Sequence, residues 1–371
     1  MGGQNLAGAR RIALGPVKKI VVKVGTSLLA DREHGISRER AKRLVADIAK
    51  LAGRYQFTLV TSGAVGLGMH AFKLARKPAD LPTKQAIAAL GQIHLMGLYY
   101  RLFHRYGLQA AQVLLTYVTI GNRSQYLHAM NALAAMHRLG IVPVVNENDT
   151  VAVDELKIGD NDRLAAYVAL LDDADLLVVL TDVDGLYACA PVPGRQNEVI
   201  PVVDRIDERI LAVAGCTRGT VTTGGMVTKL QAAQIATGSG VPLIIANGSC
   251  PNVLSRLLAG DNLGTLFLPR RRLKARERFI AYGSKRAGEL TVDGGAAAAL
   301  RRGGRSLLIA GVKGVTGSFR RGEVVSVIDL AGEEVARGVC AYSAGELRTA
   351  LTKPRTRTDR EVIHCDHLVL I

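Results

Sequence analysis

Short apolar segments alternate with longer segments of helical spacing over the first 268 residues of this chain. The apolar segments are rich in Val, Ile and Leu, and we expect them to form strands at 18–24, 57–61, 110–115, 141–145, 175–181, 199–203 and 241–246. Helices are expected at 37–51, 84–106, 126–139, 206–214 and 223–237. Uniformly apolar strands that alternate with helices are typical of βαβ units, whose parallel sheet is covered on both faces. The sequence therefore predicts an α/β fold, a three-layer αβα sandwich with a mostly parallel central sheet.

A different pattern begins near Leu266. Residues 269–278, PRRRLKARER, are rich in charged side chains. After them we expect short strands flanked by glycines at 288–292, 306–309, 323–328 and 335–339, and one small helix at 295–302. Many short strands of this kind are typical of small barrels and sandwiches. We therefore expect four regions: a flexible tail at 1–16, a first domain at 17–268, a basic linker at 269–284 and a small β-barrel-like domain at 285–371.

The cysteines and the hydropathy bear on the cellular compartment. Five cysteines are scattered through the chain and no C-x-x-C occurs, which indicates buried free thiols in a reducing cytoplasm and not disulfides or a zinc site. No apolar run reaches the roughly 18 residues of a membrane helix, and the N-terminal segment lacks the apolar core of a signal peptide. We expect a cytoplasmic protein with no membrane partner.

The net charge of +16 is unevenly distributed. Residues 270–371 contain 20 Lys and Arg against 11 Asp and Glu, a net of +9, which leaves +7 for the first 269 residues. A basic C-terminal region is compatible with a polyanionic partner such as RNA. It is equally compatible with a generally basic proteome.

Two polar clusters follow the apolar run at 141–145. Residues 146–149 read NEND, and residues 160–162 read DND just before a helix. In open α/β sheets the ligand crevice lies at the carboxyl ends of the strands, so these clusters are expected to form one side of a site. Capping of the helix explains one acidic residue. A second cluster facing the first suggests groups that grip an ammonium, hold Mg²⁺ or orient a lysine.

Three glycine turns are expected at strand or helix ends, at 25–27, 62–64 and 224–225. No P-loop pattern G-x-x-x-x-G-K-[ST] occurs. Each turn alone is more often a plain turn, and a lone lysine at a strand end is usually solvated. Together, the turns beside Lys23 and Lys229 suit a phosphoryl group, whose charge is spread over several oxygens.

Six blocks of the first domain carry a family resemblance. They are VVKVGTS (21–27), VTSGAVGLG (60–68), KQAIAALGQ (84–92), VNENDTVAVDELKIGDND (145–162), LLVVLTDVDGLY (176–187) and TGGMVTKLQAA (223–233). In this order they resemble the amino-acid kinase family, and within it the glutamate 5-kinases. The C-terminal blocks GELTVDGGAAAAL (288–300), GVTGSFRRGEVVSV (314–327) and VARGV (335–339) resemble the PUA domain that many bacterial members carry.

The resemblance implies an activity and its partners. The family transfers a phosphoryl group from ATP, with Mg²⁺, to the γ-carboxylate of L-glutamate, giving L-glutamyl 5-phosphate in the first step of proline biosynthesis. It implies feedback inhibition by proline, hand-off of the labile product to glutamate-5-phosphate reductase, and a homodimer or homotetramer. The PUA domain adds RNA as an expected but open partner.

The resemblance also implies residue roles. Lys23 and Lys229 would contact the phosphates, and Asp160 and Asp162 would orient these lysines and the metal-bound phosphates. The expected glutamate-binding residues are Ser62, Gly63, Asp149 and Asn161. The expected nucleotide-binding residues are Lys23, Thr181, Asp182, Thr223, Gly224, Gly225, Met226, Val227, Thr228 and Lys229. The segment around Glu155 would sense the inhibitor, and no residue is expected to ligate the metal by itself.

One block departs from the family pattern. Asn122, His128 and Met130 replace three polar or charged residues that the family usually has in this helix, so assembly or inhibitor response is open. Two other functions are alternatives. One is a related kinase that acts on acetylglutamate, aspartate or a nucleoside monophosphate, and the other is an RNA-binding protein with a vestigial kinase domain. The NEND and GDND blocks argue against the first, and the completeness of the kinase blocks argues against the second.

Overall fold

The computed structural model describes residues 16–31, 35–152, 161–189, 198–215, 225–269, 272–283, 286–352 and 360–371. The chain divides into two compact units, one of Met1–Thr119 and Ser124–Arg272 and the other of Ile120–Arg123 and Leu273–Ile371. Each unit has its own hydrophobic core. The predicted tail at 1–16 falls, except for its last residue, outside the described residues.

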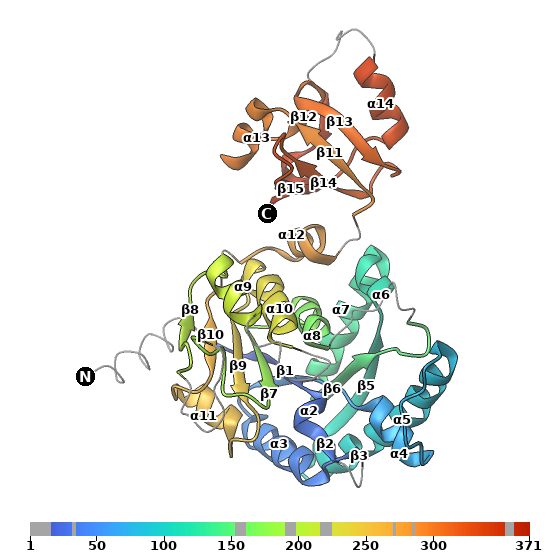
Figure 1. The fold of residues 1–371 in the computed structure, drawn as a ribbon, viewed down its shortest axis with the longest axis vertical. Helices are drawn as coiled ribbons and strands as arrows, with labels where there is room; N and C mark the ends of the chain where they lie inside the picture. Colours follow the sequence, from blue (N-terminus) through green and yellow to red (C-terminus); the bar gives the residue numbers. More distant parts are fainter. Residues whose placement is uncertain are drawn as a thin grey trace, which may run out of the picture. The chain divides into compact units, whose positions relative to one another are not determined.

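The first unit is built on a sheet that has eight strands in the described ranges, in the order β5-β6-β4-β1-β7-β9-β10-β8 (Figure 1). Neighbouring strands from β5 to β9 run parallel, and β10 is antiparallel to β9. The strands are β1 (Lys19–Val24), β4 (Gln56–Val60), β5 (Gln109–Leu115), β6 (Ile141–Glu147), β7 (Leu176–Thr181), β8 (Val202–Val203), β9 (Leu243–Asn247) and β10 (Thr265–Phe267).

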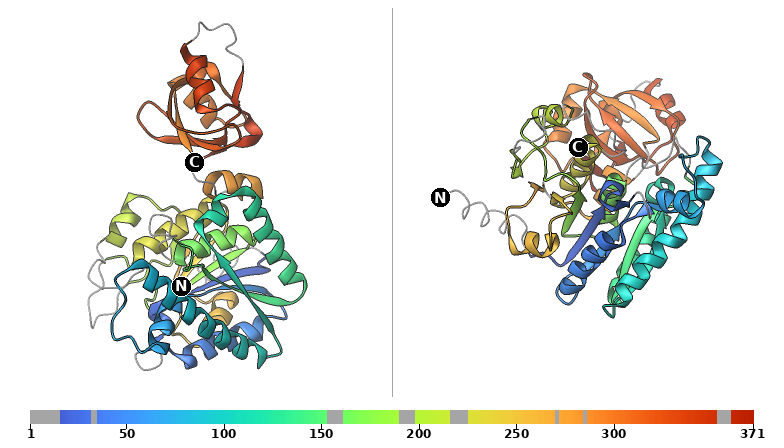
Figure 2. Two further views of the ribbon diagram at one scale, coloured as in Figure 1. Left: turned by 90° about the vertical axis from the view of Figure 1, so that its right-hand side faces the viewer. Right: turned by 60° about the horizontal axis from the view of Figure 1, so that its bottom comes forward.

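Helices cover both faces of this sheet (Figures 1 and 2). One face carries α3 (Arg38–Leu51), α4 (Ala64–Ala71), α5 (Leu81–His104) and α11 (Val253–Ala259), and the other carries α7 (Arg123–Arg138), α8 (Asn161–Leu171), α9 (Glu208–Gly215) and α10 (Met226–Gly238). The shorter α2 (Thr26–Leu29) follows β1, and α6 (Tyr117–Gly121) precedes α7. The predicted three-layer arrangement around a mostly parallel sheet is confirmed.

The two-residue period of β1 decides which side chains reach each layer. Ile20, Val22 and Val24 are fully buried in the core formed with α3, α5 and α11. Because successive side chains of a strand point to opposite faces, Lys23 points to the other layer. Its partner there is a carboxylate of α8. A buried lysine therefore lies at the carboxyl end of a central strand.

The strand order places a crevice beside β1. This strand pairs with β4 on one side and β7 on the other, while the chain passes from β6 beyond β4 to β7 across β1. At such a switch in strand order, the loops that leave the carboxyl ends diverge and leave room for a ligand. The segments that leave β4, β6 and β7 hold several of the predicted site residues, and Lys23 lies near the end of β1.

Several elements differ from those expected. Helix α4 follows Gly63 directly, where only a turn was predicted, and α5 begins at Leu81 and not Lys84, because Asp80 accepts a capping hydrogen bond from the Thr83 amide at 2.9 Å. Helix α11 and strand β10 were not predicted; nor were β2 (Ala30–Asp31), β3 (Gly35–Ile36), α6 and, in the second unit, α14 (Ala344–Thr352) and β17 (Leu368–Leu370). These elements are short, and short elements give weak periodic signals.

Backbones of α4 and α5 touch at two glycines. A Cβ atom on Gly91 would overlap the carbonyl oxygen of Ala64, and one on Gly68 would overlap the carbonyl oxygen of Ile87. Only glycine allows the two helices to approach this closely. The turn at 62–64 is thereby held against the middle of α5.

The second unit is rich in strands. Its main sheet has the order β13-β11-β14-β15-β17, and β12 (Leu307–Leu308) pairs with β16 (Glu361–Ile363). The main-sheet strands before β17 are β11 (Gly288–Val292), β13 (Val312–Gly317), β14 (Val324–Ile328) and β15 (Glu334–Val339), and the helix α13 (Gly294–Arg301) is close to its predicted range. The segment 269–284 contains α12 (Ala275–Arg278) and the π-helical turn η2 (Phe279–Gly283), whose Ile280 and Ala281 are buried with Val324 and Val369.

The expectation of buried thiols is wrong for most of the described cysteines. Cys340 is buried, Cys250 and Cys365 are half-buried, and Cys189 is exposed. Cys340 is the one of these four that belongs to a hydrophobic core cluster, that of the second unit. Among the described residues, no helix has both the length and the apolar character needed to cross a membrane.

Candidate active site

A cavity of about 450 Å³ opens at the carboxyl ends of β4 and β6. It contains four predicted site residues and two lysines that were not predicted. Its described lining consists of Thr26, Ser62, Gly63, Ala64, Val65, Gly66, Met69, Lys77, Leu81, Lys84, Gln85, Asn146, Glu147, Asp149 and Asn161. The four residues expected to bind the amino acid thus come together in one space.

Beside this cavity, one carboxylate holds two lysines. Asp162, in the first turn of α8, lies 2.6 Å from Nζ of Lys23 and 3.1 Å from Nζ of Lys229. Its side chain is completely buried, and the lysines are only 5% and 7% exposed. Thr228 donates a further hydrogen bond to the same carboxylate at 3.0 Å. Two buried ammonium groups therefore share this one carboxylate.

The protonation of Asp162 follows from two opposing effects. Burial by itself would raise the pKa of this carboxyl group, but the charges of Lys23 and Lys229 and their hydrogen bonds outweigh it and hold the pKa below its usual range. The carboxylate therefore stays ionised at neutral pH and keeps both lysines charged and fixed in position.

A chain of amide side chains fixes the orientation of Asn161. The Nδ2 group of Asn146 donates to Gln92 at 2.9 Å, so the Oδ1 atom of Asn146 is left to accept from Nδ2 of Asn161 at 3.0 Å. Asn161 Nδ2 also donates to Thr61 O at 2.6 Å and to Ser62 Oγ at 2.8 Å. Since the donor end of Asn161 is engaged, its acceptor oxygen is the end offered to a ligand.

The turn after β4 has a conformation that favours glycine. Gly63 has a φ of 106°, and a Cβ atom there would lie 2.7 Å from Cδ1 of Ile36. Just before it, Thr61 Oγ1 lies 3.0 Å from the hydroxyl oxygen of Tyr99. Burial raises the pKa of Tyr99 to about 12, so this phenol stays neutral and keeps its proton for hydrogen bonding.

The remaining predicted residues fall into two groups. Gly225, Met226 and Val227 lie at the start of α10 (Met226–Gly238), where free amide groups favour anions. Thr181 is buried at the end of β7 and donates to Asp182 at 3.0 Å. Four predicted residues lie outside the described residues, namely Glu155, Asp160, Thr223 and Gly224.

The donor set near the lysines is poorly suited to holding a metal ion directly. Both oxygens of Asp162 already contact lysine ammonium groups, and a cation there would have to displace one of them. In the described part of the chain, the one group of three His, Cys, Asp or Glu ligand atoms within 4.8 Å of one another is His364, Cys365 and Asp366 in the second unit. A metal ion at the active site would have to be carried mainly by phosphate oxygens.

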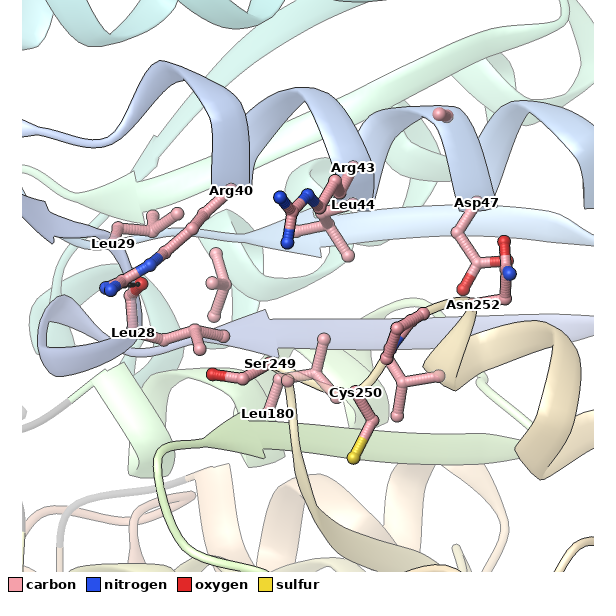
Figure 3. A pocket seen from close by; sticks show the side chains of 15 residues that line it. Leu28, Leu29, Arg40, Arg43, Leu44, Asp47, Leu180, Ser249, Cys250 and Asn252 are labelled. Carbon is pink, nitrogen blue, oxygen red and sulfur yellow. Dashed lines mark hydrogen bonds between the residues drawn. The ribbon is translucent and has the colours of Figure 1, made fainter.

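A second cavity, of about 190 Å³, lies between α2, α3 and the segment that follows β9 (Figure 3). Apolar side chains such as Leu28, Leu44 and Leu180 line it together with Arg40 and Arg43. Arg40 is engaged with the carbonyl oxygen of Leu28 at 2.9 Å. None of the predicted site residues lines this cavity.

Lys84 and Gln92 are the main site residues that the sequence did not single out. Lys84 lines the large cavity, and Gln92 begins the amide chain behind it. Both lie in the block KQAIAALGQ that carried part of the resemblance. Their spacing of eight residues places them on one face of a helix, and this polar spacing in an apolar helix was the available signal.

The fold and the site together define the class of protein: the chain belongs to the amino acid kinase family. It matches the model of that family, described as "Amino acid kinase family", over residues 18–247, and the PUA domain model over residues 288–362.

More particular similarity is to proteins named "Glutamate 5-kinase". That of Moorella thermoacetica is 44% identical over 372 residues, covering 97% of this chain and 98% of the relative. That of Caldanaerobacter subterraneus is 43% identical, covering 95% and 98%, and that of Deinococcus radiodurans is 42% identical, covering 95% and 100%. The predicted family and PUA domain are confirmed.

The three positions that depart from the family pattern lie away from the cavity. His128 is exposed on α7, Met130 is half-buried on the same helix, and Asn122 is exposed just before it. None of them lines the cavity. Their substitution therefore does not alter the described lining of this cavity.

Proposed function

We propose that this protein transfers the γ-phosphoryl group of ATP to the γ-carboxylate of L-glutamate, giving L-glutamyl 5-phosphate. The observation that carries the proposal is the adjacency of two different environments at the start of α8. Asn161 lines a cavity with both acidic and basic side chains, and the next residue, Asp162, holds two buried lysines. The near full-length similarity to proteins named "Glutamate 5-kinase" supports the choice of substrate.

The reaction needs no general base. A carboxylate is already ionised at pH 7, and no histidine is among the described residues that line the cavity. One γ-carboxylate oxygen attacks the γ-phosphorus of ATP, a new P–O bond forms, and the bond to the bridging oxygen breaks as ADP leaves with the electron pair. Catalysis then consists of positioning and charge neutralisation.

The chain's residues divide these tasks. Asp149 and the acceptor oxygen of Asn161 hold the substrate ammonium, and Ser62 and the turn at Gly63 receive the γ-carboxylate. Lys23 and Lys229 neutralise the phosphoryl oxygens as they move between donor and acceptor; a single preorganised donor of this kind contributes about 3–4 kcal/mol to the transition state. The start of α10 and the Thr181–Asp182 segment bind the rest of the nucleotide.

Mg²⁺ is the metal we assign to the nucleotide. When bound, it supplies additional neutralisation of the β- and γ-phosphates. Because Asp162 is engaged by two lysines, its role is to fix those lysines and not to ligate the ion. Asp160 is assigned the same orienting role on sequence grounds alone.

The product defines the protein's place in metabolism. An acyl phosphate is hydrolysed readily in water, so it must be passed quickly to a reductase that uses glutamyl 5-phosphate, as in proline biosynthesis. Proline carries the same α-amino-acid group as the substrate, which supports feedback inhibition at the segment around Glu155. A cytoplasmic homodimer or homotetramer, and RNA binding by the PUA domain, are proposed from the family resemblance only.

Trapping the acyl phosphate with hydroxylamine tests the proposal. Purified protein with ATP and Mg²⁺ should form the hydroxamate with L-glutamate and not with L-aspartate or N-acetyl-L-glutamate, and UMP should not stimulate ADP release. Proline should lower the rate with glutamate. Activity with another acceptor and none with glutamate would overturn the assignment.

Variants separate the two halves of the site. Lys229→Ala should lower kcat far more than it changes KM for glutamate, because Lys229 acts on the phosphoryl group. Asp149→Ala should instead raise KM for glutamate steeply. An unchanged kcat in the first variant, or an unchanged KM in the second, would contradict the corresponding role.

A further inference from the structure

The amino-acid cavity has two lysines that none of the proposed steps uses. Lys77 is exposed in the segment before α5, whereas Lys84 is half-buried in the first turns of α5. Nζ of Lys84 makes no hydrogen bond and no ion pair within 4.0 Å with any residue in the described ranges. The charge of Lys84 helps to lower the pKa of the exposed carboxyl group of Asp80. This effect is weaker than that of the hydrogen bonds between Asp80 and Thr83.

Within the described ranges Lys84 has no carboxylate partner, unlike the two lysines of the neighbouring cluster. Lys23 and Lys229, which are more deeply buried, share Asp162 as a counterion. Placing an ammonium group in a partly desolvated cavity costs free energy unless an anion compensates it. The anion that enters the cavity is the substrate, which would compensate the charge that Lys84 brings to the lining.

The lining contains the carboxylates of Glu147 and Asp149 and the ammonium groups of Lys77 and Lys84, and two of these charges can be matched with those of glutamate. The substrate has one ammonium and two carboxylates. Asp149 suits the ammonium, and the turn at Ser62 and Gly63, next to the Lys23–Asp162–Lys229 cluster, suits the carboxylate that reacts. One carboxylate is then left, and Lys84 is the half-buried cation in the same lining.

We propose that Lys84 binds the α-carboxylate of the amino-acid substrate and makes the enzyme specific for acceptors that carry it. This inference rests on the proposed function and adds to it the determinant of substrate class. Lys84 touches the non-reacting end of the substrate, so its contribution is to binding and orientation. It should therefore govern KM and the choice between substrates much more than the rate of phosphoryl transfer from a bound substrate.

The test compares L-glutamate with 4-aminobutyrate, which keeps the γ-carboxylate and the amine but lacks the α-carboxylate. Wild-type protein should favour glutamate strongly. Lys84→Met should raise KM for glutamate about 10- to 100-fold, the range expected for one hydrogen bond to a charged group, and leave kcat/KM for 4-aminobutyrate within about twofold. Lys84→Arg should restore much of the preference, because it returns the positive charge.

Two further variants control for charge and for the neighbouring lysine. Lys42→Met removes an exposed lysine of α3 outside the cavity, with 53% of its side chain exposed, and should keep the wild-type preference. Lys77→Met tests whether the exposed Lys77, and not Lys84, binds the α-carboxylate. If the preference collapses with Lys77→Met but survives Lys84→Met, the assignment to Lys84 is overturned.

The outcomes also distinguish this inference from the proposed function. Wild-type activity with glutamate, combined with an unchanged glutamate preference in Lys84→Met, refutes the role of Lys84 and leaves the kinase assignment intact. Wild-type protein that phosphorylates neither acceptor refutes the proposed function itself. Thermal unfolding of each variant at matched concentration identifies loss of folding, and Lys84→Arg then serves as the folded comparison.

Discussion

Replacing Asp162 with asparagine should destabilise the protein by unbalancing two buried lysines. Asparagine keeps the volume and one acceptor oxygen, so the change is essentially the loss of one negative charge. That charge lies 2.6 Å from Lys23 and 3.1 Å from Lys229, and the carboxylate is fully buried. Removing one partner of a buried ion pair typically costs about 3–5 kcal/mol. We expect a loss in this range, since both lysines lose their shared counterion.

Thermal and denaturant unfolding at pH 7 measure this loss directly. For a unit of this size, about 2–4 °C of Tm is lost per kcal/mol, so Tm should fall by about 6–20 °C. Asp47→Asn is the matched control, because Asp47 is also buried but accepts hydrogen bonds from the Leu254 and Ser255 amides and the Ser255 hydroxyl. Both variants should lose stability.

The change in Tm on adding a polyphosphate should distinguish the two variants. Asp162→Asn removes the negative charge that Lys23 and Lys229 share, so ATP or tripolyphosphate should raise its Tm more than it raises the wild-type Tm. Asp47→Asn should respond as the wild type does. A wild-type Tm in Asp162→Asn, or an equal response to tripolyphosphate in all three proteins, would refute the charge-balance reasoning.

The pH dependence gives an independent check with a definite sign. The pKa of Asp162 is lowered in the folded state, so its stabilisation is fully present above the unfolded value of about 3.9. It is lost as the pH falls through the lower, folded-state pKa. The stability difference between wild type and Asp162→Asn should therefore stay constant from pH 5 to 8 and shrink only in stronger acid.

Three further predictions concern neighbouring groups. Gln92→Leu should raise KM for glutamate about 2- to 12-fold with little change in kcat, because Asn146 loses the acceptor that sets its amide orientation. Gln92→Glu keeps an acceptor, so its KM should lie nearer to that of the wild type. Equal KM values in all three proteins would contradict this role of Gln92. Gly63→Ala should cost about 1–3 kcal/mol in urea unfolding because of its φ of 106°, and a neutral effect would show that the turn can relax. With the pKa of Tyr99 raised to about 12, the unfolded chain releases this proton first, so stability should fall by about 2 kcal/mol from pH 10 to 12. Tyr99→Phe should not show this part of the decline.

The sequence singled out candidate site residues most readily where one short segment of the chain carries the whole signal. Lys23 ends an apolar strand beside a glycine turn, and Asn161 and Asp162 begin a helix, so short segments were enough to single them out. What the sequence could not give is the partner of each group. That Asp162 joins Lys23 to Lys229 depends on strand register and on the packing of α10 against α8.

Residues that act through long-range contacts were missed for the same reason. Gln92 lies 54 positions from Asn146, whose amide it orients. The helix that carries Gln92 was expected, but its hydrophobic residues do not define a single apolar face, so the sequence did not show which side turns toward the site. Helix α4 was missed because its glycines, which allow close packing on α5, read as a turn.

The glycine contact between α4 and α5 has a consequence for motion. Where side chains separate two helices, one helix can shift while rotamers readjust between them. At Gly68 and Gly91 there are no side chains to readjust, and backbone lies on backbone. A displacement of α5 must then carry the turn at Gly63 with it. Lys84 and Gln92, which lie on α5, therefore move together with the turn at Gly63. If Lys84 binds one end of the substrate, as proposed, a shift of that end also moves the turn proposed to hold the other end.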